Sequence, residues 1–77
     1  MMRDEQIAEI LAKESDEFKK LSEEHRSLDN MLTGFSSKRW LNPDEEAEKK
    51  RLQKLKLLKK DRMAELIRRW RSSHILN

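Results

Sequence analysis

The sequence contains no cysteine and no tyrosine, and only one glycine and one proline among its 77 residues. Without cysteine the chain cannot form a disulfide or a thiolate metal site. It also lacks any apolar run near the roughly 20 residues that a membrane-spanning helix needs. Its first residues, Met-Met-Arg-Asp-Glu, turn acidic at once and show no apolar segment of a signal peptide. We therefore expect a cytoplasmic protein with no membrane span.

Motifs for catalysis and cofactor binding are absent from the sequence as well. There is no glycine-rich phosphate loop, no nucleophile–base arrangement and no HExxH zinc motif. The many carboxylates occur at spacings typical of a helix surface, where pairing and capping explain them. We therefore predict a protein that is not an enzyme, with no cofactor, no metal and no small-molecule substrate.

Charged residues are what the sequence has in abundance. They make up 43% of the chain, against 35% hydrophobic residues, a balance typical of coiled coils and long helices. A chain below about 70–80 residues seldom buries enough apolar surface to be stable alone. Because disulfides are excluded, we expect one helical domain over residues 1–77 that dimerises or binds another helical protein.

An apolar stripe with alternating steps of four and three residues runs through the first half of the chain. Its nine positions are Ile7, Leu11, Glu14, Phe18, Leu21, His25, Leu28, Leu32 and Phe35. Seven of them are apolar, and Glu14 and His25 are the two polar ones. This spacing keeps one side of a helix facing a partner helix. It predicts a helix over about residues 4–33 that runs through Ser15. A kink is the alternative, because Ser15 followed by two acidic residues is typical of a new helix start.

A second helix is predicted from about residue 43 to 71. Asn42 is a favourable cap, Pro43 suits the first helical position, and three acidic residues follow. Gly34 is the type of residue that follows a helix end, so residues 34–42 should form the connection. The second helix also has one apolar side, made of Leu52, Leu55, Met63, Leu66, Ile67 and Trp70.

Two long helices joined by a short connection should fold back on each other. The predicted fold is therefore all-α, an antiparallel two-helix hairpin resembling a coiled coil. A turn centred near Lys38 would pair Ile7 with Trp70, Leu11 with Leu66, Phe18 with Leu58, Leu21 with Leu55, and Glu14 with Arg62. The predicted seam comprises Ile7, Leu11, Phe18, Leu21, Leu28, Leu32, Leu52, Leu55, Met63, Leu66 and Trp70.

The first helix carries the pattern Phe18-x-x-Leu21-x-x-x-His25-x-x-Leu28-Asp29-x-x-Leu32. The second carries Leu52-x-Lys54-x-Lys56-Leu57-x-x-Lys60-Asp61-x-Met63. Over about residues 7–67 the chain resembles the small bacterial YdcH-like proteins, the DUF465 domain of unknown function. The resemblance implies a cytoplasmic bacterial helical hairpin whose biochemical role is not established, and it supplies no catalytic residues.

Four polar positions are predicted to set the register of the two helices. Glu14 should face Arg62, and His25 lies one helical turn before Asp29, within reach of a hydrogen bond. The alternative for His25 is a metal site or a proton switch. A metal site would need a second chain, because the other histidine, His74, lies near the C-terminus.

The two halves of the chain differ in charge. Residues 1–32 hold nine acidic and five basic side chains, a net charge of −4. Residues 43–77 hold six acidic and eleven basic side chains, a net charge of +5. Because the bases are spread around the second helix, we expect most of them to be solvated or paired with the acidic half. The alternative is a factor that binds nucleic acid or the ribosome through phosphates. Its candidate contacts are Lys50, Lys54, Lys56 and Lys60.

Two apolar residues are candidate partner contacts. Trp40, beside Lys38 and Arg39, is expected to cover the open end of the hairpin with Leu41, against Phe35 and Leu32. The alternatives for Trp40 are stacking on single-stranded nucleic acid or contact with a membrane surface. Leu57 lies off the main stripe and precedes Ala64 by seven residues, which suggests a second contact line. This line, or alternatively the rim of the first seam, is expected to dimerise two hairpins into a four-helix assembly.

Overall fold

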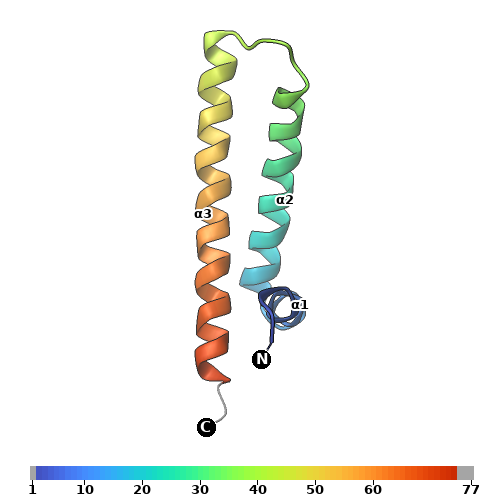
Figure 1. Ribbon diagram of the computed structural model, residues 1–77, viewed down its shortest axis with the longest axis vertical. Helices are drawn as coiled ribbons and strands as arrows, with labels where there is room; N and C mark the ends of the chain where they lie inside the picture. Colours follow the sequence, from blue (N-terminus) through green and yellow to red (C-terminus); the bar gives the residue numbers. More distant parts are fainter. Residues whose placement is uncertain (1, 75–77) are drawn as a thin grey trace.

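The computed structural model describes residues 2–74, and within this range it is all-helical. The helices are α1 (Asp4–Glu14), α2 (Asp16–Ser36) and α3 (Pro43–Ser73). In Figure 1, α2 and α3 run side by side in opposite directions, while α1 is seen end-on and crosses the lower end of α2. The all-α prediction is confirmed, but the prediction of two helices is wrong because a third is present.

Ser15 separates α1 from α2. Its backbone is extended, with φ −120° and ψ 115°, and its N–H donates to the Leu11 carbonyl at 2.8 Å. Its hydroxyl oxygen accepts the Phe18 N–H at 3.1 Å, which satisfies one of the free donors at the start of α2. The predicted continuous helix over 4–33 is therefore wrong. The capping signal at Ser15 outweighs the unbroken phase of the apolar repeat.

The largest apolar cluster lies where the three helices meet, and we call this region the closed end. Ile7, Leu11 and Phe18 are buried there. The partly buried residues packed against them are Ala8, Met63, Leu66, Ile67 and Trp70. The predicted proximity of residues 7–11 and 66–70 is thus confirmed, although α1 reaches α3 by turning across it. Leu21, Leu32 and Leu52 are the other buried hydrophobic residues of the described chain.

Ion pairs between α2 and α3 fix the register of these two helices. Arg62 pairs with Glu17 at 2.9 Å, and Lys59 pairs with Glu24 at 3.6 Å. The predicted Glu14–Arg62 pair is wrong, because Glu14 is exposed at the last position of α1, before the break.

The predicted pairing of Phe18 with Leu58 is also wrong. Phe18 is buried in the cluster with α1, whereas Leu58 is 63% exposed. The turn occupies residues 37–42 and is thus centred later than Lys38. This displacement shifts every predicted pair between the two long helices.

The connection between α2 and α3 is shorter than predicted because α2 continues to Ser36. Gly34 lies inside α2 and has no positive φ, so its predicted role beyond the helix end is wrong. The helix end is satisfied by Ser37 instead, whose N–H donates to the Thr33 carbonyl at 3.2 Å and whose hydroxyl donates to the Gly34 carbonyl at 2.8 Å.

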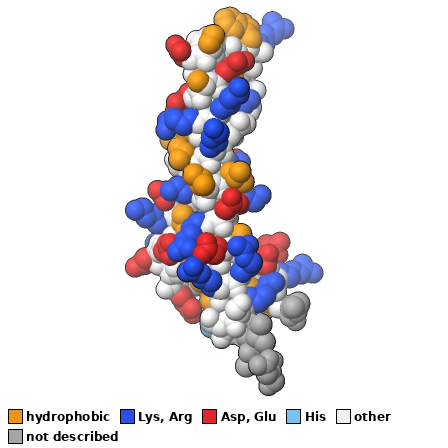
Figure 2. Space-filling view, turned by 90° about the vertical axis from the view of Figure 1, so that its left-hand side faces the viewer, with side chains coloured by type: hydrophobic (Ala, Val, Ile, Leu, Met, Phe, Trp, Pro, Cys, Tyr) orange, Lys and Arg blue, Asp and Glu red, His pale blue; other side chains and the backbone are white. Residues whose placement is uncertain are grey.

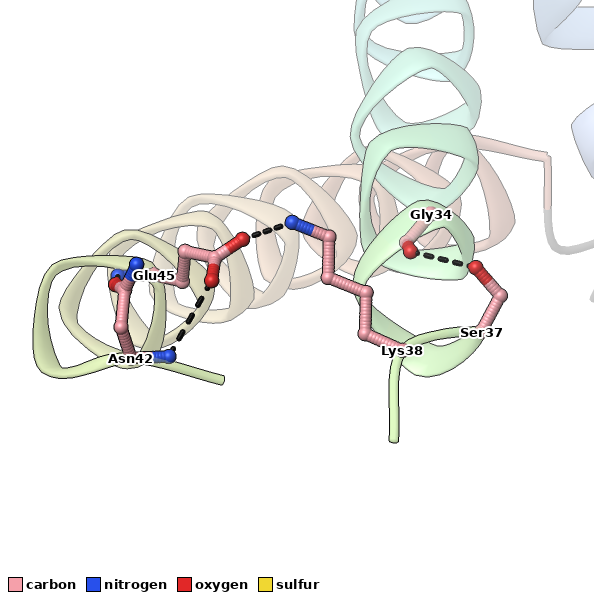
Figure 3. A network of polar contacts seen from close by, with 5 residues as sticks. All are labelled: Gly34, Ser37, Lys38, Asn42 and Glu45. Atoms are coloured by element: carbon pink, nitrogen blue, oxygen red, sulfur yellow. Dashed lines mark hydrogen bonds and ion pairs between the residues drawn. The ribbon is translucent and has the colours of Figure 1, made fainter. Parts of the chain in front are cut away.

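The predicted start of α3 is confirmed. The Asn42 side-chain oxygen accepts the Glu45 N–H at 2.8 Å, the Glu45 carboxylate accepts the Asn42 N–H at 3.3 Å, and Pro43 is the first helical residue. The Lys38 ammonium also binds the Glu45 carboxylate and so connects the end of α2 to the start of α3 (Figure 3). α3 ends at Ser73, slightly beyond the predicted residue 71. None of the helices over residues 2–74 is long and apolar enough to cross a membrane.

Candidate interaction surface

One side of the α2–α3 pair exposes a continuous set of apolar side chains. We define the open face as Leu28, Met31, Phe35, Leu55 and Leu58. Within each helix these residues are spaced by three or four positions, which places them on one side. Met31 is 52% exposed and Leu58 63%, while the other three are half-buried. Isolated exposed leucines are ordinary, but a contiguous set on one side is typical of an interaction site.

Two shallow grooves run along the open face. The first has a volume of about 450 Å³ and lies between Met31, Gly34 and Phe35 of α2 and Glu48 and Leu52 of α3. The second, of about 300 Å³, lies between Leu28 and Leu55. Leu52 is buried, so it forms the floor of the first groove. Their size and apolar lining suit large aliphatic or aromatic side chains of another helix.

Charged pairs border the open face. Glu24 with Lys59 borders the second groove, and the guanidinium of Arg51 binds Glu48 at 2.5 Å beside the first. The hydrogen bond from Arg51 lowers the pKa of the Glu48 carboxyl below its ordinary value. The border therefore carries fixed charges of both signs around an apolar centre, the arrangement common in protein interfaces.

The opposite side of the pair is a more polar groove of about 400 Å³. Asp29 there binds the Lys56 ammonium at 2.5 Å. This hydrogen bond lowers the pKa of the Asp29 carboxyl, with smaller help from the charge of His25. The predicted hydrogen bond between His25 and Asp29 is thus replaced by one from α3. Within residues 2–74, the buried Nε2 of His25 has no hydrogen-bond partner.

The four candidate phosphate contacts differ in their ion pairing. Lys50, Lys54 and Lys60 are exposed and take part in no ion pair within the described chain, whereas Lys56 is paired with Asp29. Figure 2 looks onto the outer side of α3 and shows Lys and Arg side chains along its length, with acidic and hydrophobic side chains between them. A duplex-binding helix would gather its bases on one side.

The predicted cover over the loop end is wrong for Trp40, which is 76% exposed. Phe35 belongs to α2, and the Lys38 ammonium lies 5.9 Å from its ring centroid. Because α2 extends to Ser36, the short turn carries Trp40 away from the helices while Leu41 stays half-buried. Trp40 thus adds an exposed aromatic ring at the loop end.

Leu57 lies on the polar side of α3 rather than on the open face. It is 57% exposed and lines the groove that contains Asp29 and Lys60. Ala64, its predicted companion, borders a separate hollow with His25. The two residues thus border different hollows on the same side of α3, and their role as a contact line for dimerisation stays a prediction. Met31 was not predicted from the sequence, although its position three residues after Leu28 places both on the same side of a helix.

The predicted seam divides into two groups in the structure. Most of its residues are buried or pack into the closed end, but Leu28 and Leu55 are half-exposed on the open face. No group of three or more His, Cys, Asp or Glu residues that could hold a metal occurs within residues 2–74. The resemblance to YdcH-like proteins stays a prediction. Comparison with protein-family models, curated proteins and solved structures finds no match to this chain.

Proposed function

We propose that this chain is a non-catalytic interaction protein of the YdcH-like type, in which a coiled-coil-like hairpin binds another helical protein through the open face. The observation that supports this is the exposure of Met31, which lines the first groove, and of Leu58, one helical turn after Leu55 of the second groove. Burying one such side chain fully is worth about 1.5–3 kcal/mol. A helix that fills the grooves would bury these side chains and gain this free energy, whereas in a single copy the side chains stay in contact with water.

The geometry of α2 and α3 supports the same role. Their ion pairs and the cap at Asn42 fix both helices without drawing on the open face. A binding surface on two fixed helices needs little reordering when a partner arrives, so less of its binding energy is lost. This favours recognition of a preformed helix over capture of a disordered segment.

The test compares two variants in affinity capture from cells. The double variant Met31→Glu/Leu58→Glu places two charges on the open face, while Leu57→Glu places one on the polar side. Circular dichroism must first show that both remain helical. We expect protein partners to be lost with the double variant and retained with Leu57→Glu. Equal retention by both variants would contradict the proposal.

Binding of nucleic acid is the alternative, and the exposed, unpaired Lys50, Lys54 and Lys60 favour it. In that case binding should weaken steeply with salt, because each neutralised phosphate releases counterions. It should also fall in Lys50→Glu/Lys54→Glu/Lys60→Glu and persist in Met31→Glu/Leu58→Glu. Nuclease treatment before capture separates the two functions, because it removes only partners held through nucleic acid.

A further inference from the structure

We propose that the occupant of the open face is a second copy of this chain, arranged with both loops at the same end and α2 of each copy packed on α3 of the other. This inference rests on the proposed function and adds the identity and orientation of the partner. Three observations support it: the surface area, the position of Gly34 and the charges of the two helices.

The chain exposes more surface than a compact monomer of its mass. Its accessible area is 6391 Å², whereas the general relation between mass and area gives roughly 5,000 Å² for a protein of 9.3 kDa. The elongated shape, 55 × 21 × 16 Å, accounts for the excess of about 1,400 Å². A stable dimer buries about 800 Å² per copy, so one interface along the open face fits within this excess.

Gly34 has no role in the fold of the single chain. It lies within α2 without a positive φ, and a Cβ atom added to it would meet nothing within 4 Å. In a helix interior, glycine costs about 0.5–1 kcal/mol relative to alanine. Gly34 borders the groove beside Met31 and Phe35, where a missing side chain lets the backbone of another helix approach closely. A second copy on the open face gives this glycine a function.

The charges of the helices favour a second copy and choose its orientation. α2 carries five acidic and three basic side chains, a net charge of −2. α3 carries six acidic and eleven basic side chains, a net charge of +5. A two-fold axis perpendicular to the helices would pack α2 on α2 and α3 on α3, so the two basic α3 helices would meet. A two-fold axis parallel to the helices stacks each acidic α2 on the partner's basic α3.

The ion pairs within one copy indicate that, in this second arrangement, acidic residues of α2 and basic residues of the partner's α3 also lie at the same level along the hairpin. Glu24 and Lys59 are paired, so they lie at the same level along the hairpin. A parallel two-fold axis preserves levels, and each Glu24 therefore faces the α3 helix of the partner at the level of a lysine. Met31 shares a groove with Leu52, so it faces the apolar floor of the partner's first groove.

Sedimentation equilibrium of the full chain over a range of concentrations tests the identity of the partner. We expect a monomer–dimer equilibrium whose dissociation constant rises at least about 100-fold in Met31→Glu/Leu58→Glu and little in Leu57→Glu. A monomer at every concentration would overturn the second copy, and so would equal weakening by both variants. The proposed function would still stand if capture of a different protein depended on the open face.

A single cysteine reports the orientation, because the natural chain has none. A spin label on Arg39→Cys, in the exposed loop, should give a short distance between copies if the loops lie at one end. A distance approaching the 55 Å length of the hairpin would overturn the proposed orientation in favour of the reverse one. The Met31→Glu/Leu58→Glu background supplies the control, in which the short distance should disappear.

Discussion

The two ends of the molecule have similar apolar stripes, but different numbers of helices cover them. At the closed end, α1 lies end-on at the foot of α2 in Figure 1, and its Ile7 and Leu11 pack with Phe18 and with residues of α3. At the loop end only α2 and α3 are present, and Leu32 and Leu52 are their buried contacts. Two helices cover one stripe each and leave their flanks exposed. The closed end is therefore self-sufficient, whereas the loop end presents the open face.

The difference between the two ends follows from the short length of α1. α1 is only 11 residues long and lies at the foot of α2, so it packs against the closed end alone. The exposed apolar residues Leu58, Met31 and Trp40 extend from the middle of α3 to the loop end. The apolar cluster at the closed end is thus covered by three helices, whereas the middle of the hairpin and its loop end are covered by two.

Phe18→Ala should show the largest effect on the closed end. Phe18 is buried among all three helices, and truncation of a buried phenylalanine costs about 3–5 kcal/mol of unfolding free energy. Urea denaturation followed by circular dichroism, at one fixed protein concentration, measures the loss. Leu57→Ala is the control and should change stability by less than about 0.5 kcal/mol because Leu57 is mostly exposed. Equal effects of the two substitutions would show that the closed end has no fixed core.

Ser15→Ala tests the break that makes the closed end possible. The substitution removes the hydroxyl that accepts the Phe18 N–H, and loss of such a cap costs about 1 kcal/mol. We expect a lower midpoint in urea and unchanged helix content. A gain in both helix content and stability would contradict the structure, since it would mean that alanine lets α1 and α2 join in one helix. Ser15→Asp retains a capping side chain and should stay close to the natural stability.

The break at Ser15 also shows what the sequence could and could not predict. Local spacing correctly indicated an all-helical chain, and the capping residues correctly indicated the start of α3 after Asn42. The 4–3 repeat continues through Ser15 in phase, so it could not show that one extended residue turns α1 across α3. That choice depends on tertiary contacts of Ile7 and Leu11.

The candidate site was harder to predict than the helices. Arg62 was expected to face Glu14, but the break at Ser15 and the position of the turn place it beside Glu17. Trp40 was expected to be covered, and the two extra residues of α2 after Gly34 leave it outside. The open face requires both the register and the position of α1, neither of which local patterns define.

Gly34→Ala should act in opposite directions on folding and on pairing. In a dilute sample, alanine should raise the unfolding free energy by about 0.5–1 kcal/mol, because Gly34 is helical and has room for a methyl group. The same methyl should weaken the dimer in sedimentation, since it adds bulk to the first groove. Stronger association would contradict the close approach of a second helix. Ser27→Ala, also on α2, provides a helix-propensity control.

The two tryptophans allow the ends to be compared by fluorescence. Trp40 is exposed at the loop end, whereas Trp70 packs into the closed end and stacks on His74 with ring centroids 4.0 Å apart. Trp70→Phe should leave the red-shifted emission of a solvated indole, and Trp40→Phe a bluer one. Trp40→Ala should change stability by less than about 0.5 kcal/mol. A blue-shifted Trp40 in a dilute sample would show that the loop end is covered within one copy.

The smallest expected effect is the pH dependence of the Asp29–Lys56 pair, which joins α2 to α3 near the loop end. The hydrogen bond from Lys56 lowers the pKa of folded Asp29, so the ionised carboxylate stabilises the fold above its unfolded pKa of about 4. This contribution is lost as the pH falls through the lower, folded value. Asp29→Asn should therefore reduce Tm slightly at about pH 7 and show a diminishing difference from the natural chain toward about pH 2. Lys56→Gln should abolish the same pH-dependent part, because the carboxylate then loses its donor. A Tm difference that stays constant over this range would show that the ionised pair contributes nothing to holding the loop end together.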